Sequence, residues 1–422
     1  MTLDKVIDES ISSGKRKLLL FITSLGWAYV AAGVMIMPFA QPMVMTEWNL
    51  SRNFAASLSS SGFIGMFLGA LIAGLLSDKF GRKITSILFL TIATLFSFAN
   101  GFATTPFNFI MFRVISGFGL GGLLPVLNTY LTEFLNVGIR GKYLVLLEAS
   151  WAFGSIYMAI IHMIFGRYLG WNYDFIFMGI GLLPLILLLF VPESPKYLLI
   201  KDKKEEFKKL FKYDLKDISF KKQEKSSLKN ILSKKYYKRT ILVWLQWFTM
   251  SFGYYGIFIW IKGILFNKGI DFVKADWYTF YMYIAQIPGY LLAAYFIEKI
   301  GRRKSVLFFM IGTGISSIAF AYSSQNTIVL LMSLIVSIFT LGAWGLTYAY
   351  TPELYPTQYR GTANGTSSAV TRFSGFIAPY YTAFFLEKNI IFSGITGIAI
   401  LFIITGFLNF IFLPETKNVE VN

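Results

Sequence analysis

The chain of 422 residues is 55% hydrophobic, and only 14% of its residues are charged. With a mean hydropathy of +0.59, it has too little polar surface to cover a soluble globule of this size. The sequence therefore predicts an all-α integral membrane protein, with the lipid bilayer as a partner. Cysteine is absent and His162 is the single histidine, which excludes disulfides and thiolate metal sites. No metal site and no cofactor are expected.

The net charge of +17 is unevenly distributed along the chain. Between Lys201 and Arg239 there are 15 Lys and Arg residues against 6 Asp and Glu residues, and most of the remaining excess lies in short loops after alternate apolar segments. This distribution is typical of the positive-inside pattern. It places these loops and both termini in the cytoplasm and predicts a multi-pass protein of the cell (cytoplasmic) membrane. Nucleic acid is not expected as a partner.

Twelve apolar segments are long enough to cross a hydrocarbon core of about 30 Å as helices. The first follows a polar start and is too long for a signal peptide. In chain order the predicted spans are Leu18–Val44, Phe54–Ser77, Ile84–Gly101, Phe107–Phe134, Tyr143–Arg167, Phe175–Val191, Ile241–Leu265, Trp277–Ile297, Ser305–Tyr322, Val329–Thr351, Thr362–Leu386 and Ile391–Leu413.

A basic segment separates the sixth span from the seventh. The sequence predicts a six-helix bundle over residues 1–195, a cytoplasmic linker over residues 196–239 and a second six-helix bundle over residues 240–422. Between Lys203 and Phe211 apolar residues recur every three or four positions within a basic surface. We expect short amphipathic helices there, lying on the anionic inner leaflet.

The two halves of the chain repeat each other at an offset of 220 residues. Gly74-x3-Asp78-x2-Gly81-Arg82-Lys83 returns as Ala294-x3-Glu298-x2-Gly301-Arg302-Arg303, and Glu133 with Arg140-Gly141 returns as Glu353 with Arg360-Gly361. Duplicated helical bundles that rock about a site between them are typical of alternating-access transporters. The duplication therefore favours transport.

Charged residues of both signs lie at the predicted cytoplasmic helix ends. Because carboxylate and guanidinium groups can pair in one state and separate in the next, we expect them to form a cytoplasmic gate between the bundles. A role in topology alone would need only the basic residues. The predicted gate residues are Asp78, Arg82, Glu133, Arg140, Glu193, Glu298, Arg302, Glu353, Arg360 and Glu415.

Several motifs together resemble the major facilitator superfamily over nearly the whole chain. They are the Asp78 and Glu298 loops, Arg113-x3-Gly117-x-Gly119-x-Gly121-Gly122, Pro192-Glu193-Ser194-Pro195-Lys196 and Pro352-Glu353-Leu354-Tyr355-Pro356-Thr357. Within the superfamily the chain resembles the branch shared by sugar porters, synaptic-vesicle-like metabolite transporters and organic-ion transporters. The resemblance implies 12 transmembrane helices in two pseudo-symmetric six-helix bundles, a small-molecule substrate and a monomer.

Two departures from the sugar-porter pattern bear on the substrate and on energy coupling. The seventh span has Gln246-Trp247-Phe248 and Phe252-Gly253-Tyr254-Tyr255-Gly256 where sugar porters carry Gln-Gln-x-x-Gly-x-Asn, and it resembles the organic-ion branch instead. In the first span no carboxylate follows Gly26-Trp27, although related proton symporters carry one there. Its usual partner, Arg113, remains.

Two ionisable residues inside predicted spans are the main candidates for the substrate and proton sites. Glu148 stands where the resemblance places a sugar-coordinating glutamine, and Arg372 stands where organic-ion carriers of anionic substrates have an Arg. By the 220-residue offset Arg372 corresponds to Ala152, one helical turn from Glu148. We expect Arg372 to bind an anionic or strongly polar group and Glu148, with Arg113, to couple protons. An ion pair that only fixes packing is the alternative.

Aromatic and amide residues of other spans complete the expected substrate site. Tyr254 and Tyr255 adjoin glycines and match the family pattern, whereas most aromatic residues in such a chain face lipid or pack. His162 is expected to be a packing or interfacial residue rather than a proton relay. The predicted substrate-binding residues are Arg372, Glu148, Tyr254, Tyr255, Gln246, Asn128, Trp151 and Gln286.

These features predict a secondary active transporter that moves a small polar organic solute, an organic anion or metabolite, by alternating access. Proton symport is favoured, and facilitated uniport stays open because the first-span carboxylate is missing. A sugar transporter, either symporter or uniporter, is the alternative substrate class. The sequence has no nucleophile, base and metal constellation and no Gly-x4-Gly-Lys-[Ser/Thr] phosphate loop, so neither an enzyme nor an ATP-driven pump is expected.

Overall fold

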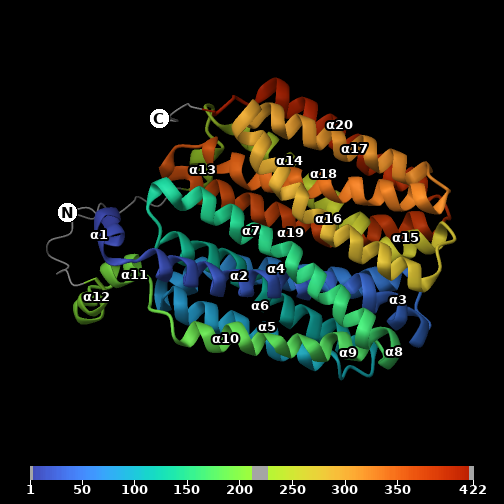
Figure 1. Ribbon diagram of the computed structural model, residues 1–422, viewed down its shortest axis with the longest axis horizontal. Helices are drawn as coiled ribbons and strands as arrows, with labels where there is room; N and C mark the ends of the chain where they lie inside the picture. The colour runs from blue at the N-terminus through green and yellow to red at the C-terminus, as the bar shows by residue number, and fades with distance from the viewer. Residues whose placement is uncertain (1–2, 212–226, 418–422) are drawn as a thin grey trace. The chain divides into compact units, whose positions relative to one another are not determined.

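The computed structural model describes residues 3–211 and 227–417, and every regular element in these ranges is a helix (Figure 1). The all-α fold predicted from composition is therefore confirmed. Residues 212–226, which fall in the predicted linker, lie outside the described residues. In chain order the helices are α1 (Leu3–Ser10), α2 (Ser13–Met35), α3 (Met37–Glu47), α4 (Arg52–Phe80), α5 (Arg82–Asn100), α6 (Pro106–Thr132), α7 (Val137–Ile161), the π-helix η1 (His162–Gly166), α8 (Arg167–Leu169), α9 (Trp171–Ile176), the 3₁₀-helix η2 (Phe177–Gly181), α10 (Leu182–Leu189), α11 (Pro195–Ile200), α12 (Lys204–Phe211), α13 (Leu228–Ile231), α14 (Tyr237–Phe258), α15 (Ile261–Asn267), α16 (Phe272–Ile300), α17 (Arg302–Tyr322), α18 (Asn326–Glu353), α19 (Thr357–Glu387) and α20 (Ile391–Phe412).

Most of the predicted spans appear as long apolar helices. Among the described residues, ten helical segments are long and apolar enough to cross a membrane, and the bent pair of α14 and α15 makes eleven. The bend between these two helices is 55°, so the predicted seventh span is broken near its end. The predicted eleventh span lies within α19, which has 31 residues and many serine, threonine and glycine residues besides Arg372. Such a polar helix is suited to face protein or a cavity rather than lipid.

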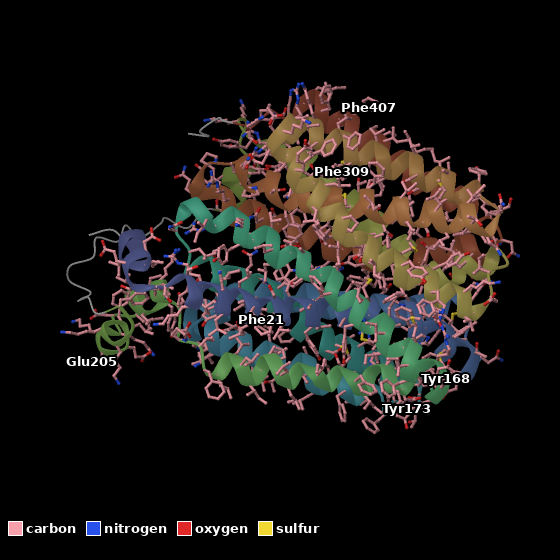
Figure 2. The ribbon with its side chains drawn as sticks, in the orientation of Figure 1. Phe21, Tyr168, Tyr173, Glu205, Phe309 and Phe407 are labelled. Atoms are coloured by element: carbon pink, nitrogen blue, oxygen red, sulfur yellow. The ribbon has the colours of Figure 1, made fainter. Side chains whose placement is uncertain are left out.

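The surface pattern of the spans is the reverse of that in a water-soluble protein. Large apolar side chains such as Phe21, Tyr168 and Phe407 are exposed (Figure 2), whereas polar Gln286 and Thr313 are fully buried. Lipid tails cover exposed apolar side chains of this kind, so the pattern agrees with a membrane-spanning protein.

The chain forms two compact units that do not follow its order. Unit 1 comprises Met1–Val34, Ile64–Gly154 and Phe175–Gln223, and unit 2 comprises Met35–Phe63, Ser155–Asp174 and Glu224–Asn422. Unit 2 thus combines the second half of the chain with two segments of the first half. The three parts predicted from the duplication, 1–195, 196–239 and 240–422, stay a prediction.

The described part of the linker is helical, but its apolar face is covered by protein. Phe207 and Phe211 of α12 are buried, and so are Val6 and Ile7 of α1. Figure 1 shows α1 beside α12, and Ser10 Oγ donates to the Phe211 carbonyl oxygen at 3.1 Å. The apolar face of α12 therefore packs against α1, and the position of these helices on the inner leaflet stays a prediction.

Candidate functional site

A buried charge cluster joins three helix ends in unit 1. Arg82, the first residue of α5, donates from Nε to Glu133 Oε2 at 3.0 Å, at the end of α6. Glu193 follows α10 and accepts hydrogen bonds from the backbone N–H of Arg82 at 2.9 Å and of Lys83 at 3.1 Å. Asp78 Oδ1 lies 3.1 Å from the Arg82 guanidinium on the exposed side. We call Asp78, Arg82, Glu133 and Glu193 the first charge cluster.

The same arrangement recurs in unit 2. Arg302 Nε donates to Glu353 Oε2 at 2.8 Å, and the Arg302 backbone N–H donates to Glu415 Oε1 at 2.8 Å. Glu298 Oε1 lies 3.6 Å from the Arg302 guanidinium. We call Glu298, Arg302, Glu353 and Glu415 the second charge cluster. The duplication in the sequence is therefore also a duplication of hydrogen bonds.

Two glycines in the left-handed region of φ shape these clusters. The φ angle is 101° at Gly81 and 92° at Gly301. A Cβ atom on Gly81 would lie 2.2 Å from Glu193 Oε2, and one on Gly301 would lie 2.6 Å from Glu415 Oε2. Glycine avoids both the backbone strain and the clash, so each carboxylate can reach the backbone N–H groups that follow.

The two clusters differ in hydration. The side chain of Glu133 is 7% exposed, whereas that of its counterpart Glu353 is 32% exposed. Burial raises the pKa of the Glu193 carboxyl above its usual value, although backbone N–H donors oppose the shift. Burial acts in the same direction on Glu415, but hydrogen bonds from four backbone N–H groups outweigh it and hold its pKa below the usual value. Glu415 of the second cluster therefore stays ionised to a lower pH than Glu193 of the first.

Arg140 and Arg360 make other contacts among the described residues. Arg140 donates to the Leu135 carbonyl and Arg360 to the Tyr355 carbonyl, both at 3.0 Å, so each caps the end of the preceding helix. The ion pairs of both charge clusters lie within one unit each. A gate in which the ten predicted residues pair between bundles stays a prediction.

Arg372 is held in place by the packing of α19 on α14. Ser251 Oγ donates to the Thr371 carbonyl at 2.7 Å, and Ser374 Oγ donates to the Phe248 carbonyl at 2.8 Å, so hydrogen bonds fix α19 on both sides of Arg372. Arg372 is 4% exposed, and its Nε is buried without a hydrogen-bond partner in the described structure. A buried guanidinium nitrogen without a partner is costly, and Nε of Arg113 shares this state.

An aromatic cluster lies against the same face of α19. A Cβ atom on Gly375 would lie 3.1 Å from the Tyr255 ring, and Arg372 is three residues earlier, on the same helix face. Ring centroids of Tyr254 and Tyr255 are 5.3 Å apart, and those of Tyr254 and Trp344 are 5.8 Å apart. Tyr254, Tyr255 and Arg372 thus belong to the same unit, Tyr255 approaches α19 one turn from Arg372, and Trp344 joins the two tyrosine rings. Sequence reasoning missed Trp344, although Gly345 follows it as Gly256 follows Tyr255.

The two predicted amide residues of unit 2, Gln246 and Gln286, differ in how many of their polar atoms have hydrogen-bond partners. Gln246 donates to Thr347 Oγ1 at 2.8 Å and accepts from Asn409 Nδ2 at 2.7 Å, so both ends of its amide already hold α18 and α20. Gln286 Nε2 donates to Tyr254 Oη at 3.4 Å, and its Oε1 is buried without a hydrogen-bond partner. Gln286 Oε1 therefore has no internal partner, whereas both polar atoms of the Gln246 amide have one, and the substrate-binding role of either residue stays a prediction.

The remaining predicted site residues belong to unit 1. Arg113 is buried on α6 and donates to the Gly33 carbonyl at 2.9 Å. Glu148 and Trp151 are buried on α7, and Asn128 is half-buried on α6. The predicted pairing of the Glu148 and Arg372 faces concerns both units and stays a prediction.

Sequence reasoning missed a set of buried charges in unit 2. Lys262 lies inside the predicted seventh span and forms an ion pair with Asp276 at 2.7 Å, with both side chains fully buried. His162 packs on Phe39, with ring centroids 4.8 Å apart, but it also pairs with Asp174 at 2.8 Å. The expectation that His162 only packs was therefore incomplete. A lysine within an apolar span was the signal that could have found this set.

Comparisons with known proteins agree with the fold. The chain matches the family described as "Sugar (and other) transporter" over residues 15–422. It is 33% identical to a Bacillus subtilis protein named putative niacin/nicotinamide transporter NiaP, over 96% of this chain and 98% of that protein. It is 27% identical to the synaptic vesicle 2-related protein of Pongo abelii, over 90% of this chain and 75% of that protein. The partially occluded, inward-open xylose transporter XylE from E. coli has the same fold, with a TM-score of 0.78 and 19% identity over 97% of this chain and all of that one.

The helical fold and the duplicated charge clusters define a multi-pass membrane protein of the secondary transporter class, which moves small organic solutes. The chain belongs to the sugar (and other) transporter family of the major facilitator superfamily. The resemblance seen in its motifs is thus confirmed.

Replacing Gly81 by Ala is expected to destabilise the protein by roughly 1–3 kcal/mol, because alanine strains this backbone conformation and pushes Glu193 off the α5 N-terminus. The measurement is thermal unfolding in detergent. Gly74→Ala is the matched control, since its Cβ meets nothing within 4 Å in the same region of the chain. Equal melting temperatures for the two variants would contradict the role given to Gly81.

Proposed function

We propose that this protein carries a small organic anion across the cytoplasmic membrane together with protons, and that Arg372 binds the anionic group. The observation that carries the proposal is the buried Arg372 Nε without a hydrogen-bond partner in the described structure. A substrate carboxylate would satisfy it with a charge-assisted hydrogen bond, for which the planar guanidinium is well suited. The protein acts as a monomer with both termini in the cytoplasm.

The aromatic cluster beside Arg372 favours a substrate with a flat ring. Tyr254, Tyr255 and Trp344 offer ring faces and edges, which pack well against another aromatic ring. Two relatives at 33% identity are named for niacin transport, and nicotinate combines a pyridine ring with a carboxylate. We therefore propose aromatic carboxylates of this size as the substrate class and nicotinate as the first probe.

Glu148 is the proposed proton-coupling residue, with Arg113 as its companion in unit 1. Both side chains are buried in membrane-spanning helices, where ionisable residues commonly serve ion or substrate pathways. This arrangement would take the place of the missing first-span carboxylate.

A sugar is the second candidate substrate. It is favoured by Gln286 Oε1, which is buried without a hydrogen-bond partner and would suit a sugar hydroxyl. The family described as sugar (and other) transporters includes both possibilities.

Arg372→Ala is expected to lower nicotinate uptake into proteoliposomes by about 10- to 100-fold, the loss that fits one hydrogen-bonded charge. Lys388→Ala is the control, because it removes an exposed cation at the end of the same helix. Wild-type uptake of nicotinamide, which has the ring but no charge, should be weak. Unchanged nicotinate uptake by Arg372→Ala would overturn the assignment, and gradient-independent sugar uptake by both variants would favour the sugar facilitator.

Glu148→Gln is expected to abolish nicotinate accumulation driven by an inward proton gradient while leaving nicotinate exchange at equal pH intact. The reason is that glutamine keeps the shape of the side chain but cannot bind the proton. Both processes are measured in the same proteoliposomes with labelled nicotinate. Accumulation that persists in this variant would remove Glu148 from the coupling role.

A further inference from the structure

Five charged or titratable side chains from five helical elements gather in unit 2, away from the second charge cluster. Asp276 and Glu298 lie near opposite ends of α16, separated by about 33 Å of helix rise. We call the gathered set the buried charge network. Its members are His162 of η1, Arg167 of α8, Asp174 of α9, Lys262 of α15 and Asp276 of α16.

His162 lies at the centre of the network. Its Nδ1 is 2.8 Å from Asp174 Oδ2, and its Nε2 is 3.3 Å from Lys262 Nζ and 3.6 Å from Asp276 Oδ1. All four of these side chains are fully buried. Arg167 completes the network, since its Nε donates to Asp276 Oδ2 at 2.7 Å and its side chain is 11% exposed.

When Lys262 is an ammonium group, its contact with His162 Nε2 is compatible with one protonation state of the imidazole. An ammonium group can only donate, so the hydrogen bond requires Nε2 to be an acceptor. The imidazole is then neutral and carries its proton on Nδ1, which donates to Asp174. In this state two carboxylates balance two cations, and the buried charge network is neutral overall.

One further proton would change this pairing. A proton on Nε2 would place two cations 3.3 Å apart in a region closed to water, where their repulsion is strong. Asp276 Oδ1 lies within 3.6 Å of Nε2 and could accept from the imidazolium in place of Lys262. The imidazolium and the ammonium therefore compete for one carboxylate oxygen.

The surroundings of the network are built around these charges. The ring of Phe272 lies 3.8 Å from Lys262 Nζ, and Phe39 covers His162 from α3, with Tyr283 behind it. A Cβ atom on Gly166 would lie 2.0 Å from Asp174 Oδ1, so the π-helix η1 and its glycine make room for the carboxylate. π-helical turns are frequent at functional sites.

A purely structural role explains the two ion pairs but not the imidazole between them. Buried ion pairs often stabilise a protein no more than apolar residues of the same volume would. Five buried polar groups are therefore not needed merely to hold these helices together. The imidazole adds a group that can bind a further proton, and its Nε2 lies 3.3 Å from the Lys262 ammonium. That placement makes the pairing of Lys262 sensitive to a single proton.

We propose that the buried charge network is a proton-binding site in which His162 Nε2 takes up a proton from water and Lys262 is thereby displaced from the imidazole. The step forms one N–H bond, breaks the hydrogen bond between Lys262 and His162, and transfers no other atom. Arg167, the partly exposed member, marks the side from which the proton arrives. Any role of this proton in transport rests on the proposed function. The binding of the proton at His162 is independent of that function.

The single histidine of the chain allows a direct test on the intact wild-type protein. The protein is labelled with ¹⁵N-histidine, purified through a tag without histidine, and its imidazole signals are followed by NMR between pH 5 and pH 9 in nanodiscs. We expect the neutral Nδ1–H form at high pH and a one-proton titration within this range. A signal that does not titrate while the protein stays folded, or a neutral Nε2–H form, would overturn the proposal.

Two variants then test the competition for Asp276. In Lys262→Met the titration midpoint should move to higher pH by at least about one pH unit, because a nearby cation is gone. In Lys268→Met, which removes a lysine of the same region that donates to backbone carbonyls, the midpoint should not move. Equal midpoints in all three proteins would show that Lys262 does not compete with the proton.

A transport measurement separates this inference from the proposed function. Nicotinate exchange in proteoliposomes is measured across the same pH range for the wild type and for His162→Gln. If the proposed function holds, the pH dependence around the NMR midpoint should flatten in His162→Gln, and an unchanged profile would deny this proton a role in transport. If nicotinate is not carried at all, the proposed function fails while the NMR titration still decides the proton site.

Discussion

The cost of burying charge governs where this chain places its polar atoms. Each ion taken out of water loses several kcal/mol of hydration, which only close partners can restore. Both charge clusters meet this demand in the same way, with one guanidinium, one glutamate at a helix end and one glutamate that accepts backbone N–H groups of the helix that begins with the arginine. Helix N-termini stabilise such carboxylates further. The helix ends of both halves are therefore fixed by equivalent contacts.

Equivalent contacts do not make the two clusters energetically equal. The carboxylate of Glu193 is sufficiently buried that its pKa is raised, whereas Glu415 is held ionised by its backbone donors. In a transporter that alternates between states, unequal clusters would open at different costs. The duplicated sequence gives both clusters the same hydrogen bonds, and the difference in burial makes the pKa values of their carboxyls unequal.

The sequence analysis predicted the helical membrane fold and its duplication because both depend on patterns that are local or strictly periodic along the chain. It also named every member of the two charge clusters, since each lies in a short motif with fixed spacing. It could not predict that Gln246 is occupied by Thr347 and Asn409, because these partners lie on other helices at unrelated distances in sequence. It could not predict that α1 packs on the apolar face of α12, because nothing local in the sequence shows this contact. Lys262 and Asp276 were missed for a similar reason, since they meet only after the 55° bend that follows α14.

Buried charges among the described residues differ in how they are paired, and Arg113 donates only to a backbone carbonyl while its Nε, like that of Arg372, has no hydrogen-bond partner. In the charge clusters and in the buried charge network, each ion has an opposite charge within the same unit. Arg372 Nε has no hydrogen-bond partner among the described residues, and the hydrogen bonds beside it run from the hydroxyls of Ser251 and Ser374 to backbone carbonyls of α19 and α14. A fully paired arginine would have to break an internal ion pair before it could bind an anion, and a fully exposed one would bind it through water. A buried guanidinium with an open hydrogen-bonding position avoids both costs, which is what reversible binding of an anion requires.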